Sequence, residues 1–332
     1  MPRSPSTAAA LLLVLAGCAA SPASDDAGNP SAASASSPTV SSATVDNCGT
    51  DVPLGQAPER VVTIKSAATE MLLALGLEDR IVATAFPDGP VPPDLAPERG
   101  PLPVLSESVP SQEAVLALEP DFVYAGWESS LTADAVGDRG FLASLGIGSY
   151  VSPSACRGEE HRPDKLGFED VFDAITEAGA VFGAPEAAAE LVAQQRILLD
   201  SVAPAREGTT VLWYSSGTDV PYVGAGTGAP QMILEELGLV NVAADVEDSW
   251  ASLSWEAVVA ADPDVIVLVD ARWNTAESKK ERLRADPATS TLEAVLEERF
   301  LVVPFAAGEA GVRNAEAVLD LAAQLEALEA RP

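Results

Sequence analysis

An internal repeat is the feature of this sequence that most constrains its fold. The segment SQEAVLALEPDFV at 111–123 recurs as SWEAVVAADPDVI at 254–266, with a constant offset of 143 residues. Each copy begins with a serine typical of a helix N-cap, carries Glu in the first turn and ends before a proline followed by an apolar strand. A second pair, LLALGL at 72–77 and ILEELGL at 233–239, places glycine at the end of a helix. The chain is therefore built from two related halves.

Strands and helices alternate within each half. In the first half we predict strands at 61–64, 81–85, 122–125 and 149–151, and helices that end at 75, begin at 111 and cover 133–145. The second half repeats this order through strands at 211–214, 265–269 and 301–305. Such alternation predicts an α/β fold of two Rossmann-like lobes with mainly parallel sheets and a ligand cleft between them. Helices at 168–182 and 185–202 separate the halves, and the second is long enough to span the lobes as a spine.

The chain begins with a targeting segment. A short apolar run behind Arg3 leads into Leu15-Ala16-Gly17-Cys18, which is typical of a lipoprotein signal peptide. Cys18 would then carry the lipid that anchors the protein to the extracytoplasmic face of the cell membrane. An ordinary secretory signal with a chance cysteine is the alternative. We expect a signal peptide at 1–18, a disordered Ser/Ala/Pro tether at 19–45, lobes at 46–167 and 207–332, and a helical link at 168–206.

Two cysteines remain in the folded part. Because the environment outside the membrane is oxidising, we predict a disulfide between Cys48 and Cys156. Two separate buried thiols are the alternative, since sequence alone does not bring their Cα atoms together.

Composition excludes several functions. The chain has 19 basic and 50 acidic residues, a net charge of −31, which opposes binding to nucleic acid. One histidine and three cysteines do not make a zinc or copper site, and we expect His161 to be solvated. No P-loop or nucleophile elbow is present, so we predict no catalysis and no cofactor. The glycine-rich stretch 224–228 is interpreted as a flexible cleft loop.

Residues that follow the predicted strands would face the cleft. Aromatic residues there favour a flat ligand, and three basic residues favour an anionic one. The alternatives are packing within a lobe for the aromatic side chains and pairing with surface carboxylates for the basic ones. We interpret Trp250 and Trp255 as packing residues. The candidate ligand-binding residues are Lys65, Ser66, Trp127, Tyr214, Ser215, Ser216, Tyr222, Arg272, Trp273, Asn274 and Arg313.

The segments ERVVT at 59–63, TE at 69–70 and ALG at 74–76, together with the repeat, resemble the substrate-binding lipoproteins of ABC importers for cobalamin, haem and iron siderophores. The resemblance implies a monomer that captures a small molecule and docks on a permease dimer. It also implies that one glutamate on each lobe binds arginines of the permease, and Glu113 and Glu256 match these positions. The alternative is that both acids only stabilise the N-termini of their helices.

Five further segments resemble the subgroup of putative importers of F(420)-0, a deazaflavin coenzyme precursor: VDNCG at 45–49, VVTIKS at 61–66, YAGWES at 124–129, LWYSSG at 212–217 and EAGVRN at 309–314. The resemblance thus implies F(420)-0 as the ligand. Cobalamin, haem or a ferric siderophore is the alternative ligand on the same scaffold. An extracytoplasmic enzyme or a signalling receptor is the more distant alternative, because a fold alone does not fix function.

Overall fold

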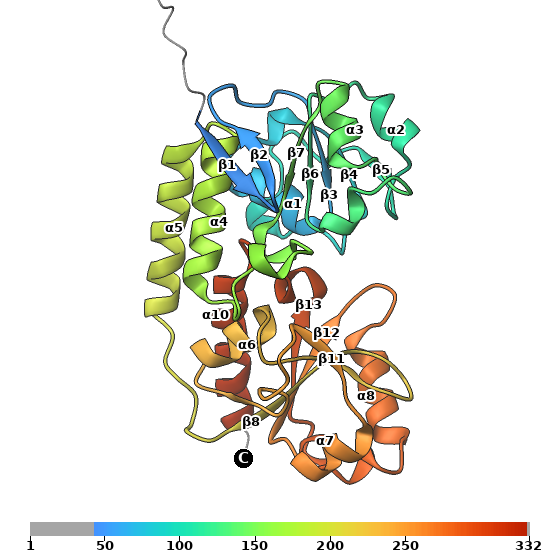
Figure 1. Cartoon of the computed structure of the whole chain (residues 1–332). Coiled ribbons are helices and arrows are strands. Elements are labelled where there is room, and N and C mark those ends of the chain that lie inside the picture. The colour runs from blue at the N-terminus through green and yellow to red at the C-terminus, as the bar shows by residue number, and fades with distance from the viewer. Residues whose placement is uncertain (1–42, 331–332) are drawn as a thin grey trace, which may run out of the picture. The chain divides into compact units, whose positions relative to one another are not determined.

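The computed structural model describes residues 43–330, which belong to one folded unit, Ser42–Pro332. Cys18, the predicted signal peptide and most of the predicted tether lie outside the described residues. Within this unit, two β-sheets flanked by helices form two lobes, drawn one above the other in Figure 1. The predicted α/β class with two mainly parallel sheets is confirmed.

The sheet of the first lobe is parallel throughout, in the order β5-β4-β3-β6-β7. Its central strands β3 and β6 are buried at every residue, which explains why their sequences, VVTI and FVYA, are mostly apolar and lack the polar alternation of a half-exposed strand. Three of the four predicted strands have the expected bounds, and the fourth begins one residue earlier. The strands are β3 (Val61–Ile64), β4 (Ile81–Ala85), β5 (Val104–Ser106), β6 (Phe122–Ala125) and β7 (Gly148–Val151).

The helices of the first lobe are α1 (Ser66–Ala74), α2 (Gln112–Leu116) and α3 (Arg139–Ser144). The predicted helix over 133–145 is wrong in its first half. Gly137 has a φ of 116°, a conformation that interrupts a helix. Asp138 then caps α3 by accepting a hydrogen bond from the backbone N–H of Phe141 at 2.8 Å.

The sheet of the second lobe is mixed. Its order is β11-β9-β8-β12-β13, and β10 also pairs with β8. β8, β10, β12 and β13 pair in parallel, whereas β9 and β11 add an antiparallel edge. The strands are β8 (Thr210–Ser216), β9 (Tyr222–Gly224), β10 (Val240–Asn241), β11 (Trp250–Ser252), β12 (Val265–Asp270) and β13 (Phe300–Pro304). The helices are α6 (Ala229–Glu236), α7 (Trp255–Ala261), α8 (Ala276–Ala285), α9 (Glu293–Leu296) and α10 (Asn314–Glu329).

The repeat occupies equivalent places in the two lobes. Ser111 and Ser254 cap α2 and α7, each accepting a hydrogen bond from the backbone N–H three residues on, at 3.3 and 3.1 Å. After each helix an acidic residue adopts a positive φ, 47° at Glu119 and 40° at Asp262. The strands that follow, β6 and β12, pair in parallel with β3 and β8, respectively. The two halves therefore share backbone conformation as well as sequence.

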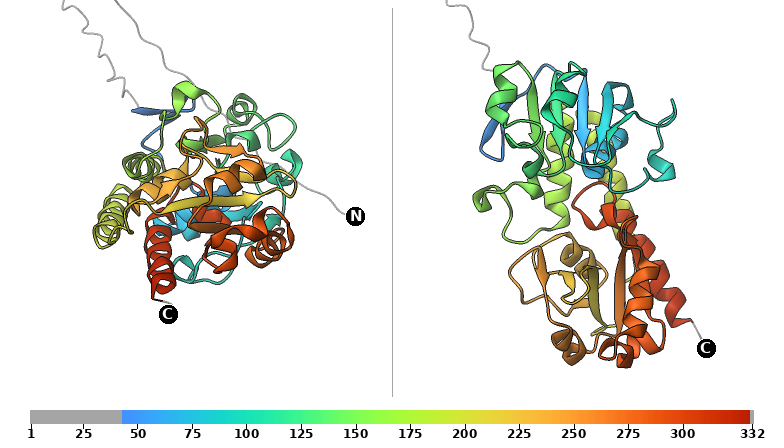
Figure 2. Two further views of the ribbon diagram at one scale, coloured as in Figure 1. Left: turned by 90° about the horizontal axis from the view of Figure 1, so that it is seen from below. Right: turned by 90° about the vertical axis from the view of Figure 1, so that its right-hand side faces the viewer.

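Two helices link the lobes in place of the predicted single spine. α4 (Phe168–Val181) and α5 (Pro185–Asp200) pack side by side next to the first lobe. Gly183, with a φ of 66°, and Pro185 at the start of α5 separate them. α5 also contacts α10, which runs from the junction of the lobes along the second lobe (Figure 2).

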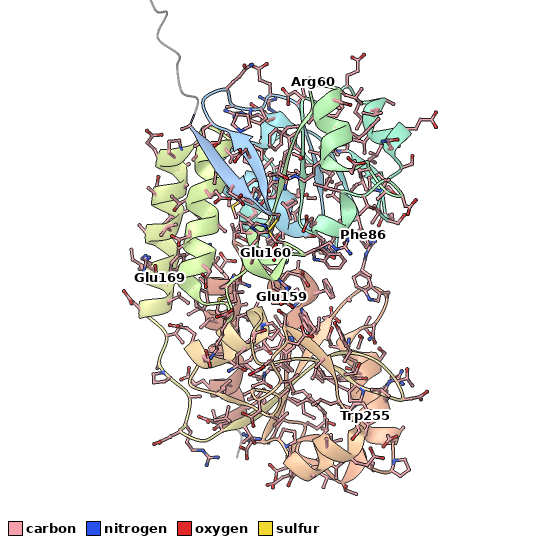
Figure 3. All side chains as sticks on the ribbon, in the orientation of Figure 1. Arg60, Phe86, Glu159, Glu160, Glu169 and Trp255 are labelled. Atoms are coloured by element: carbon pink, nitrogen blue, oxygen red, sulfur yellow. A yellow bond between two sulfur atoms is a disulfide. The ribbon has the colours of Figure 1, made fainter. Side chains whose placement is uncertain are left out.

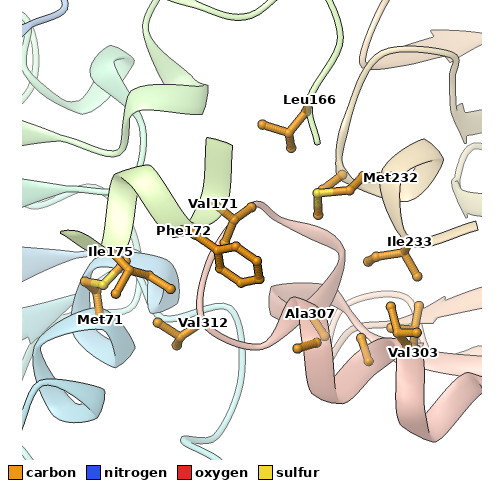
Figure 4. Close-up of a cluster of buried hydrophobic side chains, with 14 of the residues drawn as sticks. Met71, Leu166, Val171, Phe172, Ile175, Met232, Ile233, Val303, Ala307 and Val312 are labelled. Carbon is orange, nitrogen blue, oxygen red and sulfur yellow. The ribbon is translucent and has the colours of Figure 1, made fainter. Parts of the chain in front are cut away.

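One hydrophobic cluster extends from the first lobe through α4 into the second (Figure 4). Phe172 of α4 lies at its centre, with Met71 and Ile175 toward the first lobe and Ile233 and Val303 toward the second. All five side chains are buried. The lobes are thus joined by continuous apolar packing on the α4 side.

A short hairpin, β1 (Thr44–Asn47) and β2 (Thr50–Pro53), packs against the first lobe. Because β1 begins at Thr44, the predicted boundary of the tether at residue 45 lies two residues too far along the chain. The turn of the hairpin carries Cys48, and the predicted disulfide to Cys156 is present, with a Cα–Cα distance of 5.3 Å. No helix within residues 43–330 is long and apolar enough to cross a bilayer.

Candidate functional site

A cavity of about 770 Å³ lies between the lobes. Its first-lobe wall is the turn-rich segment after β7, which contains Glu159, labelled in Figure 3 at the level where the lobes meet. Its second-lobe wall comes from three loops, which precede α6, precede β11 and follow β13. The lining residues are Ser154, Ala155, Glu159, Arg162, Pro163, Asp164, Leu166, Thr227, Gly228, Ala229, Glu247, Asp248, Ser249, Trp250, Glu309 and Ala310. This volume is within the usual range of small-molecule sites.

The cavity is acidic. Five carboxylates and one guanidinium line it, a net charge of −4 if all are ionised. Four of the carboxylates are exposed, and Glu309 is partly buried. This sign is opposite to the one expected from the sequence, since none of the three predicted basic residues lines the cavity. The carboxylates are Glu159, Asp164, Glu247, Asp248 and Glu309.

An aromatic pair stands at the second-lobe wall. Trp250, at the start of β11, packs against the hydrophobic cluster as expected, and it also lines the cavity. The Tyr222 ring stacks on it, with ring centroids 6.0 Å apart and planes inclined by 15°. Tyr222 is 40% exposed and lies in β9, opposite Ser252 of β11, so that Trp250, two residues before Ser252, is its diagonal neighbour on the same face of the sheet. Tyr222 does not itself line the cavity, so the aromatic platform on which a flat or cationic group can stack is the Trp250 ring, supported by Tyr222.

Glu309 connects the cavity to the first lobe. Its Oε2 accepts a hydrogen bond from Nε1 of Trp127 at 2.8 Å, across the lobe boundary. Burial raises the pKa of Glu309, and the Trp127 hydrogen bond and the Lys65 charge offset part of that rise. The predicted ligand residue Trp127 therefore bridges the lobes instead of lining the cavity.

Lys65 and Ser66 belong to an internal ion pair and do not line the cavity, so their role in binding an anion stays a prediction. The Lys65 side chain is 2% exposed and its ammonium pairs with Asp88. Asp88 also accepts a hydrogen bond from the backbone N–H of Ser66 at 3.2 Å. The Lys65 ammonium lies 3.7 Å from the centroid of the Trp127 ring and 5.1 Å from that of Phe305, a residue of the second lobe. The positive charge is thus already compensated.

The other two predicted cations are also paired, because a carboxylate faces each across the lobe boundary. Arg313 is bound bidentately by Glu70 of α1, with Nε to Oε2 at 2.5 Å, and both side chains are nearly buried. Burial nevertheless raises the pKa of Glu70, and the hydrogen bond and charge of Arg313 offset part of the rise. Arg272 pairs with Glu107 at 2.6 Å on the exposed surface. The structure thus agrees with the alternative prediction for the basic residues, that they pair with carboxylates.

Residues at the end of β8 belong to the lobe core. Tyr214 is fully buried, its hydroxyl donates to the carbonyl of Gly217 at 2.5 Å, and its ring packs edge-to-face with Trp255 at 5.3 Å. Ser215 is buried, and Ser216 continues the strand, so none of these three β8 residues lines the cavity. The Tyr214 ring is enclosed by lobe packing, which does not support its predicted ligand role.

Trp273 and Asn274, which follow β12, lie outside the cavity. Trp273 is 59% exposed and touches Phe305 edge-to-face at 5.3 Å. The carbonyl of Asn274 accepts a hydrogen bond from Nζ of buried Lys279 at 2.6 Å. Neither Trp273 nor Asn274 lines the cavity.

The two repeated glutamates are free for a partner. Glu113 and Glu256 are exposed in the first turns of α2 and α7, and neither has an ion pair or side-chain hydrogen bond within residues 43–330. In Figure 1, α2 and α7 belong to different lobes and lie away from the linking pair α4 and α5.

Sequence reasoning missed the first-lobe wall of the cavity. Residues 154–166 form only short turns and show no hydrophobic period, so no pattern marks them. A usable signal was the glycine-rich stretch 224–228, interpreted as a cleft loop, of which Thr227 and Gly228 line the cavity. Among the described residues, no group of three or more His, Cys, Asp or Glu is placed to hold a metal ion. His161, expected to be solvated, lies against Gly49 with its side chain 28% exposed.

Comparison with known protein families gives one match. Residues 61–307 match the model of the periplasmic binding protein family. Among curated proteins, the chain is 27% identical to the uncharacterized ABC transporter substrate-binding lipoprotein YvrC of Bacillus subtilis, over 84% of each chain. It is 30% identical to a cobalamin-binding protein of Halobacterium salinarum, over 67% of this chain and 57% of that protein.

Among solved structures, the chain is similar to binding proteins of the same kind. A periplasmic binding protein from Veillonella parvula superposes with a TM-score of 0.75 and 28% identity, covering 86% of this chain and 98% of that one. A protein of an ABC-type Fe3+-hydroxamate transport system from Saccharomonospora viridis superposes with a TM-score of 0.70 and 27% identity, over 87% and 99% of the two chains.

Proposed function

Because the chain belongs to the periplasmic binding protein family, we propose that it captures a corrinoid of the cobalamin class in its interlobe cavity and delivers it to an ABC importer. As the substrate-binding protein of such an importer it is not an enzyme. The ligand class is the part that needs an argument from the cavity itself.

The acidic lining with an aromatic platform is the observation that carries this choice. A corrinoid presents amide N–H groups that can donate to carboxylates, and a broad macrocycle whose edge can pack on Trp250. The single phosphodiester of cobalamin is balanced by the charge of its cobalt macrocycle. A cavity of net charge −4 therefore does not repel this ligand.

The same lining argues against the deazaflavin precursor. F(420)-0 carries a phosphodiester and a carboxylate, and the basic residues that we expected to receive them are paired with Asp88, Glu107 and Glu70. Haem is disfavoured on two counts: its propionates are anionic, and its iron needs an axial ligand such as histidine. Among the described residues, no histidine, tyrosine, cysteine or methionine lines the cavity. A ferric hydroxamate, which carries no carboxylate at the metal, is the second candidate, supported by the likeness to the Saccharomonospora viridis structure.

A binding panel tests the ligand class. We expect cyanocobalamin to quench tryptophan fluorescence at micromolar concentration or below, and F(420)-0 to give no saturable signal. Trp250→Leu should weaken cyanocobalamin binding about tenfold, since a central aromatic contact is worth more than 1 kcal/mol. Trp273→Leu is the matched control, because this exposed tryptophan does not line the cavity. Binding of F(420)-0 without cyanocobalamin would overturn the assignment.

We also propose that Glu113 and Glu256 dock the protein on its permease. Their exposure, their lack of partners within residues 43–330 and their equivalent positions on α2 and α7 support this role. Two equal acidic contacts suit a partner with twofold symmetry. Lipid attachment at Cys18, which lies outside the described residues, would keep a monomeric carrier at the extracytoplasmic membrane surface, and the lipoprotein YvrC is a relative of this kind.

A further inference from the structure

The cavity wall contributed by the first lobe has little regular structure of its own. Between Gly158 and Asp164, its backbone hydrogen bonds in the described structure stay within one short turn. On either side of it, the backbone N–H of Arg157 donates to Glu128 at 2.5 Å, Lys165 pairs with Glu235 of α6, and the backbone N–H of Leu166 donates to the carbonyl of Thr227 at 2.9 Å. We call residues 153–166 the wall segment. A segment with so few bonds to the rest of the protein needs another restraint to keep a defined shape.

The β1–β2 hairpin is a firm anchor beside the wall segment. Cys48 and Gly49 form its two-residue turn, with φ of 53° and 74°, the pattern of a type I′ turn. Buried Asn47 exchanges two hydrogen bonds with the backbone of Val151, both at 2.8 Å, so the hairpin is fixed to the end of β7. Arg139 adds a hydrogen bond to the carbonyl of Asn47 at 2.6 Å.

Two contacts join this anchor to the middle of the wall segment. The Cys48–Cys156 disulfide is a covalent bond, and Cys156 is 2% exposed. The His161 ring lies against Gly49, where an added Cβ would come within 2.9 Å of Nε2 of the ring. Nδ1 of the same ring lies 3.6 Å from Oδ1 of Asp46. Glycine at position 49 therefore provides both the positive φ of the turn and the space for this ring.

We propose that the Cys48–Cys156 disulfide positions the wall segment, so that the ligand affinity of the cavity depends on the redox state of this bond. The part of this inference that concerns affinity rests on the proposed role of the cavity as the ligand site. Cys48 is partly exposed, so a small dithiol can reach it. The dithiol supplies two electrons and two protons, the disulfide becomes two thiols, and the dithiol becomes a disulfide. The freed wall segment then samples other conformations.

Hydrogen exchange measured without ligand tests the positioning role directly. In the full folded chain, reduction followed by alkylation, or the Cys48→Ser/Cys156→Ser variant, should speed exchange at least tenfold at the hydrogen-bonded amides of Arg157, His161 and Arg162, measured in peptides from 157–165. Peptides from β3 and β6 should be unchanged. If the variant folds poorly, the reduced wild type provides the same comparison. Unchanged exchange in 157–165, or an equal increase in β3 and β6, overturns the inference, because the disulfide would then have no effect or only a global one.

Ligand binding is the second readout. Cyanocobalamin should bind the reduced protein at least tenfold more weakly than the oxidised protein, mainly through faster dissociation. A Gly49→Ala variant, which displaces His161 but keeps the disulfide, should give a smaller loss. Equal affinity of the oxidised and reduced forms overturns the dependence on redox state. If the oxidised protein does not bind cyanocobalamin at all, the proposed ligand is wrong, whereas the exchange result still decides the positioning role.

Discussion

Replacement of Lys65 by methionine tests whether the predicted anion site is an internal ion pair. Methionine keeps most of the side-chain volume but leaves the Asp88 carboxylate, 1% exposed, without its counterion. Removing one partner of a buried pair costs about 3–5 kcal/mol, because an uncompensated charge stays buried. An unfolding entropy of about 2.1 cal/mol/K per residue gives about 0.6 kcal/mol/K over residues 43–330, so a loss of about 4 kcal/mol lowers Tm by about 7 °C.

Calorimetry of a double-mutant cycle is the assay. The Lys65→Met/Asp88→Asn variant should be less destabilised than the sum of its single variants, since it buries no unpaired charge. Arg272→Met is the matched control: it also removes the cation of an ion pair, but the side chains of Arg272 and Glu107 are 59% and 65% exposed, so we expect a loss below about 1 kcal/mol. If Lys65→Met changes Tm no more than Arg272→Met does, Lys65 is not held by the pair, and an anion-binding role is open again.

Two further predictions concern Glu309 and the docking residues. Because its pKa is raised above the ordinary 4.5, folded Glu309 holds a proton more readily than the unfolded chain does. The wild type should therefore lose stability relative to Glu309→Gln as the pH rises through that raised pKa, and the difference in stability should level off below pH 4.5. Denaturant titrations at several pH values check this, and a difference in stability that does not change with pH contradicts it. Glu113→Ala with Glu256→Ala should leave cyanocobalamin binding intact and impair cellular uptake. The control is Glu119→Gly with Asp262→Gly, which removes acids from the other ends of the same helices, and equal uptake by both double variants rules out specific docking.

The repeat made the framework predictable from sequence. Serine caps, prolines and apolar strands are local signals, and both copies carried them, so β6 and β12 and the helices before them appear where expected. The helix over 133–145 failed for a local reason too, since Gly137 outweighs the apolar residues around it. The disulfide could be predicted because only two cysteines remained in the folded part.

The site was less predictable because it depends on partners distant in sequence. Lys65 follows a strand as a ligand residue would, but Asp88, which neutralises it, comes from an irregular loop whose path no pattern specifies. Trp250 packs against the hydrophobic cluster as expected, but its place in β11, which pairs with β9, also brings it to the cavity, and no local pattern indicates this. Whereas the end of β8 belongs to the lobe core, the residues just past β3 and β6 face the other lobe, through the contacts of Lys65 with Phe305 and of Trp127 with Glu309. Their side chains fill that space with contacts between the lobes, and the solvent-accessible volume lies next to them.

Apolar packing from Met71 through Phe172 to Val303 restricts how far the two lobes can move when a ligand binds. Swinging the two halves apart would hydrate these side chains at about 25 cal/mol per Å² of exposed apolar area. Empty and loaded forms should therefore keep nearly the same separation between α2 and α7. A transporter that contacts the protein at both helices must then distinguish its ligand-bound form from its ligand-free form by contacting the rim of the cavity or the ligand itself.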